Sequence, residues 1–173
     1  MSGNQFTPAV LAYVALGSNL GDSVATLRAA MDRLREHTVG EFLQSSLWQT
    51  SPVDCPPGSP RFVNAVVAFA PSPAETPERL LNKLQALERE FGRQRKKVLN
   101  EARPLDLDLI AFGNEAYSTP TLTLPHPRAH LRRFVLQPLA EIAPDLILPG
   151  QEMAVRELLQ QLRTDEHIVR LVN

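Results

Sequence analysis

Residues 105–109 alternate strictly between leucine and aspartate, and in a β-strand this alternation separates the two residue types onto opposite faces. Leu105, Leu107 and Leu109 then form an apolar face, while Asp106 and Asp108 share the other face. At about 3.3 Å per residue, side chains at i and i+2 lie roughly 7 Å apart. The pattern therefore predicts a sheet that is packed on its leucine side and carries two neighbouring carboxylates on its other side.

Two carboxylates this close repel each other and are stabilised by a shared proton or by a bound cation. Mg²⁺ suits them, because it keeps several waters and binds through one or two carboxylates plus substrate phosphates. Basic side chains precede the strand in the sequence, at Arg103 and at Arg93, Arg95, Lys96 and Lys97. Acidic metal ligands beside basic groups predict a phosphoryl-transfer site that uses a nucleotide. The alternative is a solvated strand face with two incidental aspartates, although aspartate is depleted in strands.

Hydrophobic periodicity predicts the elements that precede this strand. The expected elements are strands at 10–16, 42–48 and 62–69, and helices at 24–35 and 77–91. The resulting order is that of the ferredoxin-like α+β fold, an antiparallel sheet with helices packed on one face. A proline-rich C-terminal extension follows and closes with an amphipathic helix at 153–162.

Length, charge and targeting signals limit the class of protein. A chain of 173 residues suits one domain, and a net charge of −1 argues against a protein that coats nucleic acid. The single cysteine, Cys55, has no internal disulfide partner, which fits a reducing cytoplasm. A signal peptide begins with a positively charged region, but no Lys or Arg precedes Arg28. No apolar run is long enough to span a membrane. We expect one cytoplasmic, monomeric domain over residues 1–173, with no nucleic-acid or membrane partner.

Two smaller groups of side chains have patterns that allow more than one interpretation. Phe62 and Phe134 can sandwich a planar heterocycle whose amide-like edge pairs with Asn64, although core packing explains each phenylalanine equally simply. Gln85 and Glu88 lie one turn apart on the second predicted helix and face the same way. They either face the site beside the aspartate strand or form an ordinary solvated helix face.

His126 and His130 have a spacing that can bind zinc on a helix. Prolines flank His126, however, which disfavours a regular helix, and a third ligand is lacking. A hydrogen bond from His126 to a phosphate is better supported, because three arginines lie nearby: Arg128, Arg132 and Arg133.

Several motifs occur in the order in which a known enzyme family has them. They are Ala-Leu-Gly-Ser-Asn-Leu-Gly at 15–21, Thr-Ser-Pro-Val at 50–53, Phe-Val-Asn-Ala at 62–65, Arg-Pro-Leu-Asp-Leu-Asp-Leu at 103–109, Leu-Pro-His-Pro at 124–127 and Arg-Arg-Phe-Val-Leu-Gln-Pro-Leu at 132–139. Over roughly residues 12–150 the chain thereby resembles the 6-hydroxymethyl-7,8-dihydropterin pyrophosphokinases of folate biosynthesis. The resemblance implies transfer of pyrophosphate from ATP to the hydroxymethyl group of 6-hydroxymethyl-7,8-dihydropterin, with release of AMP.

The resemblance also implies a role for individual residues. Asp106 and Asp108 would bind two Mg²⁺ ions, and Arg93 and Arg103 would engage the phosphates. The positions that match the ATP site are Gln85, Glu88, Arg95, Lys96, Leu109, Thr123, His126 and Arg132. The positions that match the pterin pocket are Thr50, Val53, Phe62, Asn64 and Phe134.

Some positions depart from the family pattern, and other functions of the fold need to be weighed. Asn100 stands where many members carry a tryptophan that closes over the site, and Thr121 where some carry an arginine near ATP. These departures concern loop closure and ATP affinity, and not the class of reaction. A ferredoxin-like sheet also serves RNA recognition, but aspartates on its face would repel phosphate unless metal is bound. A purely structural or regulatory domain would not need the arginine and aspartate set.

Overall fold

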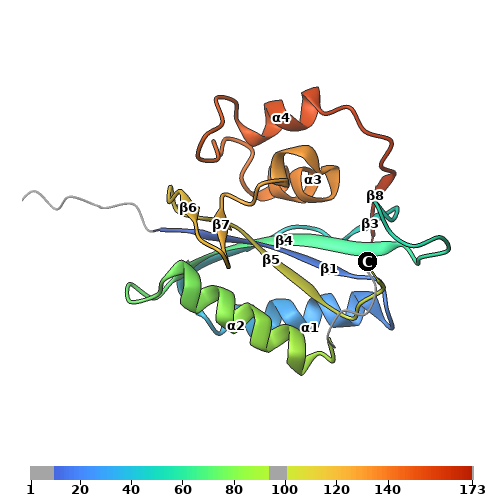
Figure 1. The fold of residues 1–173 in the computed structure, drawn as a ribbon, viewed down its shortest axis with the longest axis horizontal. Helices are drawn as coiled ribbons and strands as arrows, with labels where there is room; N and C mark the ends of the chain where they lie inside the picture. The colour runs from blue at the N-terminus through green and yellow to red at the C-terminus, as the bar shows by residue number, and fades with distance from the viewer. Residues whose placement is uncertain (1–9, 94–100, 173) are drawn as a thin grey trace, which may run out of the picture.

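The computed structural model of the chain describes residues 10–93 and 101–172. The elements, in chain order, are β1 (Ala12–Ser18), α1 (Ser23–Arg35), β2 (Thr38–Gln44), β3 (Trp48–Thr50), β4 (Phe62–Pro71), α2 (Pro77–Glu90), β5 (Asp106–Phe112), β6 (Tyr117–Ser118), β7 (Thr123–Leu124), a 3₁₀ turn (Ala129–Leu131), α3 (Arg133–Ile142), α4 (Val155–Gln161) and β8 (Ile168–Arg170). Figure 1 shows the main sheet with helices on both of its faces, and β6 pairs with β7 in a separate two-stranded sheet.

The main sheet has the strand order β5-β1-β4-β3-β8, and β2 also pairs with β4. All its pairings are antiparallel. In the centre, Gly17 of β1 lies opposite Asn64 of β4 on one side and opposite Asp106 of β5 on the other. Directly opposed residues share a face of the sheet, so the register places Asp106 and Asn64 on the same face, separated only by a glycine.

Two hydrophobic cores lie on opposite sides of the sheet. Helices α1 and α2 cover one face, where Leu105, Leu107 and Leu109 are buried, as the alternating pattern predicts. Helices α3 and α4 cover part of the other face through a second cluster that includes Val66 and Leu136. The ferredoxin-like α+β prediction is confirmed, and the C-terminal extension adds a second helical layer to it.

The ends of the first two helices follow from local chemistry. Asp22 caps α1 by accepting a hydrogen bond from the N–H of Ala25 at 3.2 Å. Thr76 caps α2 in the same way, and Pro77 occupies the first helical position, where no N–H is needed. Beyond α2, Gly92 adopts a φ of +90°, a conformation that few residues other than glycine accept.

Several parts of the chain differ from the sequence-based expectation. The predicted strand at 42–48 is two strands, because the Oγ of Ser45 accepts from the N–H of Val66 at 2.9 Å in the gap between them. Helix α3 and the short strands β6, β7 and β8 were not predicted from the sequence at all. Within the described ranges, no helix combines the length and apolar character needed to cross a membrane.

Candidate active site

A pocket of about 280 Å³ lies over the polar face of β1, β4 and β5. One wall is the start of the loop that connects β3 to β4, and another is the segment that leads into α3. The sequence-predicted residues that line it are Thr50, Val53, Phe62, Asn64, Arg103, Asp106, Asp108, Arg132 and Phe134. The fold thus brings all five predicted pterin positions, both predicted metal ligands, the predicted phosphate contact Arg103 and the predicted ATP contact Arg132 to one cavity.

Asn64 forms the polar centre of the pterin side of this pocket. It is buried, and its Nδ2 donates a hydrogen bond to the Oγ1 of Thr50 at 2.6 Å. A Cβ added to Gly17 would lie 2.9 Å from the Oδ1 of Asn64. Because Gly17 has no side chain, the amide can lie flat against β1 with its carbonyl oxygen kept in place.

Replacing Gly17 by alanine should therefore weaken pterin binding by about 1–3 kcal/mol, the usual cost of overpacking a tight site. The added methyl group displaces the amide of Asn64 from its position. Gly40→Ala is the matched control. Gly40 lies on β2, and its added Cβ would be 3.6 Å from the Cβ of Ala70, an ordinary van der Waals distance. Calorimetric titration with 6-hydroxymethylpterin measures both variants, and equal affinities for the two would refute this role of Gly17.

The acidic side of the pocket contains Asp106 and Asp108. Arg93 lies 2.6 Å from Oδ1 of Asp106, and Arg103 lies 3.5 Å from Oδ2. Burial, together with repulsion from Asp106, raises the pKa of Asp108 to about 7, against the opposing influence of Arg132. Positive charge placed beside the pair would therefore favour its ionised form.

This donor set fits Mg²⁺. Within residues 10–93 and 101–172, no cluster of three or more His, Cys, Asp or Glu side chains is arranged to hold a metal. The protein would therefore supply the carboxylates of Asp106 and Asp108, and water and phosphate oxygens would supply the remaining ligands. This division is the usual one for Mg²⁺ at nucleotide sites.

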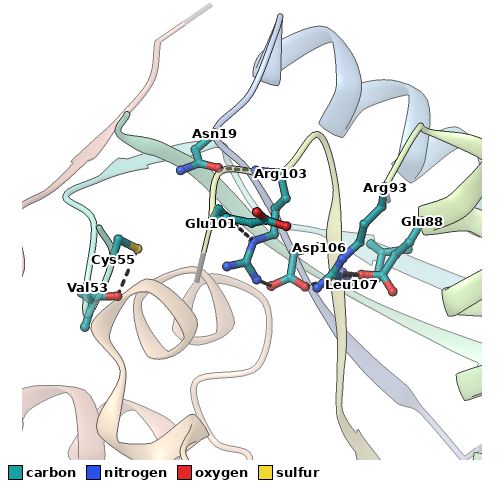
Figure 2. Close-up of polar contacts among 9 residues, drawn as sticks. All are labelled: Asn19, Val53, Cys55, Glu88, Arg93, Glu101, Arg103, Asp106 and Leu107. Carbon is teal, nitrogen blue, oxygen red and sulfur yellow. Dashed lines mark hydrogen bonds and ion pairs between the residues drawn. The ribbon is translucent and has the colours of Figure 1, made fainter. Parts of the chain in front are cut away.

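Arg93 joins the acidic pair to helix α2 (Figure 2). It forms an ion pair with Glu88, which is buried and also accepts a hydrogen bond from the N–H of Leu107 at 3.1 Å. Burial raises the pKa of Glu88, while Arg93 acts in the opposite direction. Glu88 thus lies on no solvated helix face, and it ties the guanidinium of Arg93 to the edge of the pocket.

The backbone of Arg103 is held by a residue that the site predictions missed. Asn19 is buried, and its Oδ1 accepts from the N–H of Arg103 at 2.9 Å (Figure 2). Its own N–H donates to the carbonyl of Arg103 at 3.1 Å, and its Nδ2 donates to the carbonyl of Pro60 at 3.3 Å. Asn19 belongs to the motif at 15–21, but nothing local indicated which distant segment its amide would hold.

Other predicted ATP contacts lie outside the lining of this pocket. Gln85 on α2 and Thr123 on β7 are exposed, and Leu109 is buried in the core beneath the sheet. Burial, reinforced by Arg132, lowers the pKa of His126 to about 4, so its ring is neutral near pH 7. Two further predicted contacts, Arg95 and Lys96, lie outside the described residues, as does Asn100.

Comparison with known proteins gives a consistent result. The family model for 7,8-dihydro-6-hydroxymethylpterin-pyrophosphokinase (HPPK) matches residues 13–144. The chain is 38% identical to the 2-amino-4-hydroxy-6-hydroxymethyldihydropteridine pyrophosphokinase of Haemophilus influenzae, over 94% of this chain and 98% of that protein. It is 42% identical to the protein of the same name from Pseudomonas aeruginosa, over 79% of this chain and 83% of that protein.

Solved structures agree on the fold. The crystal structure of wild-type Plasmodium falciparum HPPK-DHPS with SDX-DHP superposes with a TM-score of 0.69 at 13% identity, over 89% of this chain and 44% of that one. A crystal structure of HPPK-DHPS in complex with substrates gives a TM-score of 0.67 at 14% identity, over 89% of this chain and 43% of that one. This chain therefore spans less than half the length of those proteins. On the strength of the family match and the bacterial relatives, the chain belongs to the 7,8-dihydro-6-hydroxymethylpterin-pyrophosphokinase family.

Proposed function

We propose that this protein transfers pyrophosphate from ATP to the hydroxymethyl group of 6-hydroxymethyl-7,8-dihydropterin, with release of AMP, in folate biosynthesis. One observation carries the proposal. A single pocket joins an aromatic and amide slot, suited to a pterin, to paired carboxylates with arginines, suited to metal-bound phosphate. The two halves meet at Gly17, across which Asn64 and Asp106 are neighbours on one face of the sheet.

The pterin ring enters the slot between Phe62 and Phe134, where both of its faces contact aromatic rings. Asn64 pairs with the amide-like edge of the ring, and its hydrogen bond to Thr50 fixes which way the amide points. Val53, which is 39% exposed, covers the rim. This arrangement orients the hydroxymethyl group toward the acidic half of the pocket.

The phosphates of ATP occupy the half that contains the arginines. The side chain of Arg103 is only 12% exposed, and that of Arg93 is 17% exposed, so both charges act in a poorly solvated setting. Two Mg²⁺ ions held by Asp106 and Asp108 would neutralise phosphate charge and align the attacking and leaving oxygens. Arg132 lies on the opposite wall, where it adds a further positive charge.

The reaction forms a bond from the hydroxymethyl oxygen to the β-phosphorus of ATP, breaks the bond from that phosphorus to the α–β bridging oxygen, and releases the hydroxyl proton to solvent. Negative charge grows on the bridging oxygen and on the β-phosphoryl oxygens. Arg103 and Arg93 are preorganised to stabilise this charge, because Asn19 holds the backbone of Arg103 and Glu88 holds the side chain of Arg93. The neutral His126 donates its remaining ring N–H to a phosphate oxygen, since its Nδ1 accepts from the N–H of Arg128 at 3.2 Å.

We further propose that the protein acts as a cytoplasmic monomer formed by one domain, with small molecules as its partners. The lining residues come from neighbouring elements, the strands β1, β4 and β5 with the loop after β3 and the segment before α3, which supports a pocket formed within one domain. Sedimentation of the purified protein tests this directly, and a dimer at assay concentrations would contradict it.

Product analysis tests the reaction itself. Purified protein is incubated with ATP, the reduced pterin alcohol and Mg²⁺, and the nucleotides are separated by chromatography. We expect AMP and a pterin diphosphate in equal amounts, with no turnover when EDTA removes the metal. Formation of ADP with a pterin monophosphate, or consumption of ATP that does not depend on the pterin, would contradict the proposal.

Replacing Asn64 by alanine should weaken pterin binding by on the order of 1–3 kcal/mol, since a buried ring edge loses its partner. Nucleotide affinity should hold, because the amide lies on the pterin side of Gly17. Calorimetry with each ligand separately measures both effects. Equal losses for the two ligands would mean that Asn64 supports the fold and does not recognise the pterin.

A further inference from the structure

The segment from Thr164 to Leu171 returns from α4 to the edge of the sheet and ends beside β3 (Figure 1). We call these residues the C-terminal strap. The strap lies beyond the part of the chain that the family model matches, residues 13–144. It nevertheless contacts two elements that carry walls of the pocket.

The first contact is at the N-terminus of α3. Arg132 stands at the cap position and makes no side-chain capping bond. The carboxylate of Glu166 accepts instead from the N–H of Arg133 at 3.1 Å and from the N–H of Phe134 at 3.4 Å. Thr164 donates from its Oγ1 to the same carboxylate at 2.9 Å. An acidic group is stabilising there because free N–H groups and the helix dipole both favour negative charge.

The second contact is at the start of the β3–β4 loop. The carbonyl of His167 accepts from the N–H of Ser51 at 3.1 Å, and the N–H of His167 donates to the Oγ of Ser51 at 3.1 Å. The strand β8 then continues the pairing, with Ile168 opposite Thr50. Ser51 and Thr50 line the pocket on the side where Asn64 is held.

Glu166 and His167 are consecutive residues, so a single peptide unit links the two contacts. One end of this link holds the backbone of Phe134, and the other holds that of Ser51. The strap therefore helps to set the spacing between α3 and the end of β3, together with the packing of both elements against the sheet. A planar ring bound between these walls depends on that spacing, whereas no hydrogen bond or ion pair among the described residues joins Asp106 or Asp108 to the strap.

We propose that the C-terminal strap positions the walls of the pterin pocket, and that Glu166 is the positioning residue for Phe134. The inference rests on the proposed function, because it takes the slot beside Phe134 to be the pterin site. Glu166 acts through the first turn of α3 and does not touch the substrate. Its hydrogen bonds to α3 go to the N–H groups of Arg133 and Phe134 and not to Arg132. Its loss should therefore affect pterin affinity more than nucleotide affinity or the chemical step.

Glu157 provides a matched control. Its carboxylate accepts from the N–H of Ala154 at 2.8 Å and so caps the neighbouring helix α4, but it lines no part of the pocket. The variants Glu166→Ala, Glu166→Gln and Glu157→Ala are compared in the full-length protein. The measurements are the Kd for 6-hydroxymethylpterin, the Kd for a non-hydrolysable ATP analogue, and the thermal unfolding temperature.

We expect Glu166→Ala to weaken pterin binding by about tenfold, because loss of the cap destabilises the first turn of α3, which carries Phe134. Nucleotide affinity should change by less than about threefold, since the cap bonds of Glu166 go to Arg133 and Phe134. Glu166→Gln should recover part of the pterin affinity, since an amide oxygen still accepts from the helix N–H groups but carries no charge. Glu157→Ala should lower the unfolding temperature comparably and leave pterin affinity unchanged.

Pterin affinity of wild-type strength in Glu166→Ala would overturn the proposal, as would equal losses for pterin and nucleotide. If Glu166→Ala does not fold, the same comparison between Glu166→Gln and the wild type decides the matter. Phe134→Ala separates this test from the proposed function. Unchanged pterin affinity in Phe134→Ala would refute the pterin slot itself, whereas a loss there with none in Glu166→Ala would refute the strap alone.

Discussion

Replacing Asp108 by asparagine should reduce turnover by on the order of 10³-fold, since each lost metal ligand removes several kcal/mol of charge stabilisation from the transition state. Asparagine preserves the shape of the side chain but not its negative charge. The fold should persist, because burial and the neighbouring Asp106 already disfavour the charge of Asp108, as its raised pKa of about 7 indicates. Pterin binding without nucleotide should change little.

The measurement is steady-state AMP formation over a range of Mg²⁺ concentrations, with thermal unfolding as the check on folding. Asp145→Asn is the control, since Asp145 pairs with Arg156 on the surface and its side chain is 77% exposed. Asp106→Asn should be comparably inactive, but it also removes the partner of Arg93 and Arg103 and is therefore harder to interpret. Near-wild-type turnover of Asp108→Asn at ordinary Mg²⁺ would contradict the metal assignment.

Replacing Arg103 by alanine should lower the catalytic rate by on the order of 10²-fold or more, the usual cost of removing one fixed stabilising group. Arg103 lines the pocket, lies 3.5 Å from Asp106, and has its backbone fixed by Asn19. Charge that grows on phosphate oxygens in the transition state gains more from this cation than ground-state ATP does. Arg103→Lys should restore only part of the rate, because an ammonium lacks the planar fork of donors.

Single-turnover kinetics separates the chemical step from binding in this variant. Pterin affinity should fall far less than the rate, although the guanidinium of Arg103 lies 6.0 Å from the ring centre of Phe62 and contributes some packing there. Arg156→Ala is the control for loss of a surface arginine. An unchanged chemical step in Arg103→Ala would mean that Arg103 serves only to pair with Asp106 and takes no part in catalysis.

The elements that could be predicted are those in which apolar residues recur at the spacing of a strand or a helix. The alternation at 105–109 predicted both faces of β5, and its leucines are buried while its aspartates line the pocket. The leucine stripe of α2 and the proline at its start were equally informative. In each case the spacing of apolar residues alone shows which side of the element is buried.

Helix α3 and strand β8 could not be predicted in this way. Helix α3 contains Pro138, and the N–H groups of its first turn are capped by Glu166 from the far end of the chain. Strand β8 has three residues and is defined only by its pairing with β3. Both elements are stabilised by partners that are distant in sequence, so the local pattern carries little signal for them.

The same distinction applies to the site. Residue chemistry and family resemblance together named side chains that meet in one pocket, including Asn64, Asp106 and Phe134. They did not reveal that Asn19 holds Arg103, or that Gly17 leaves room for an amide, because both facts depend on strand register. The ATP contacts expected at Gln85 and Thr123 stay predictions, since both residues are exposed and lie outside the pocket lining.

A crystal structure of the protein with a non-hydrolysable ATP analogue, Mg²⁺ and 6-hydroxymethylpterin tests the central claim most directly. We expect the pterin ring between Phe62 and Phe134, with its amide-like edge on Asn64. We expect Mg²⁺ on Asp106 and Asp108, with the phosphates beside Arg103. A pterin bound away from this slot, or a phosphate chain that does not meet the carboxylates on β5, would contradict it.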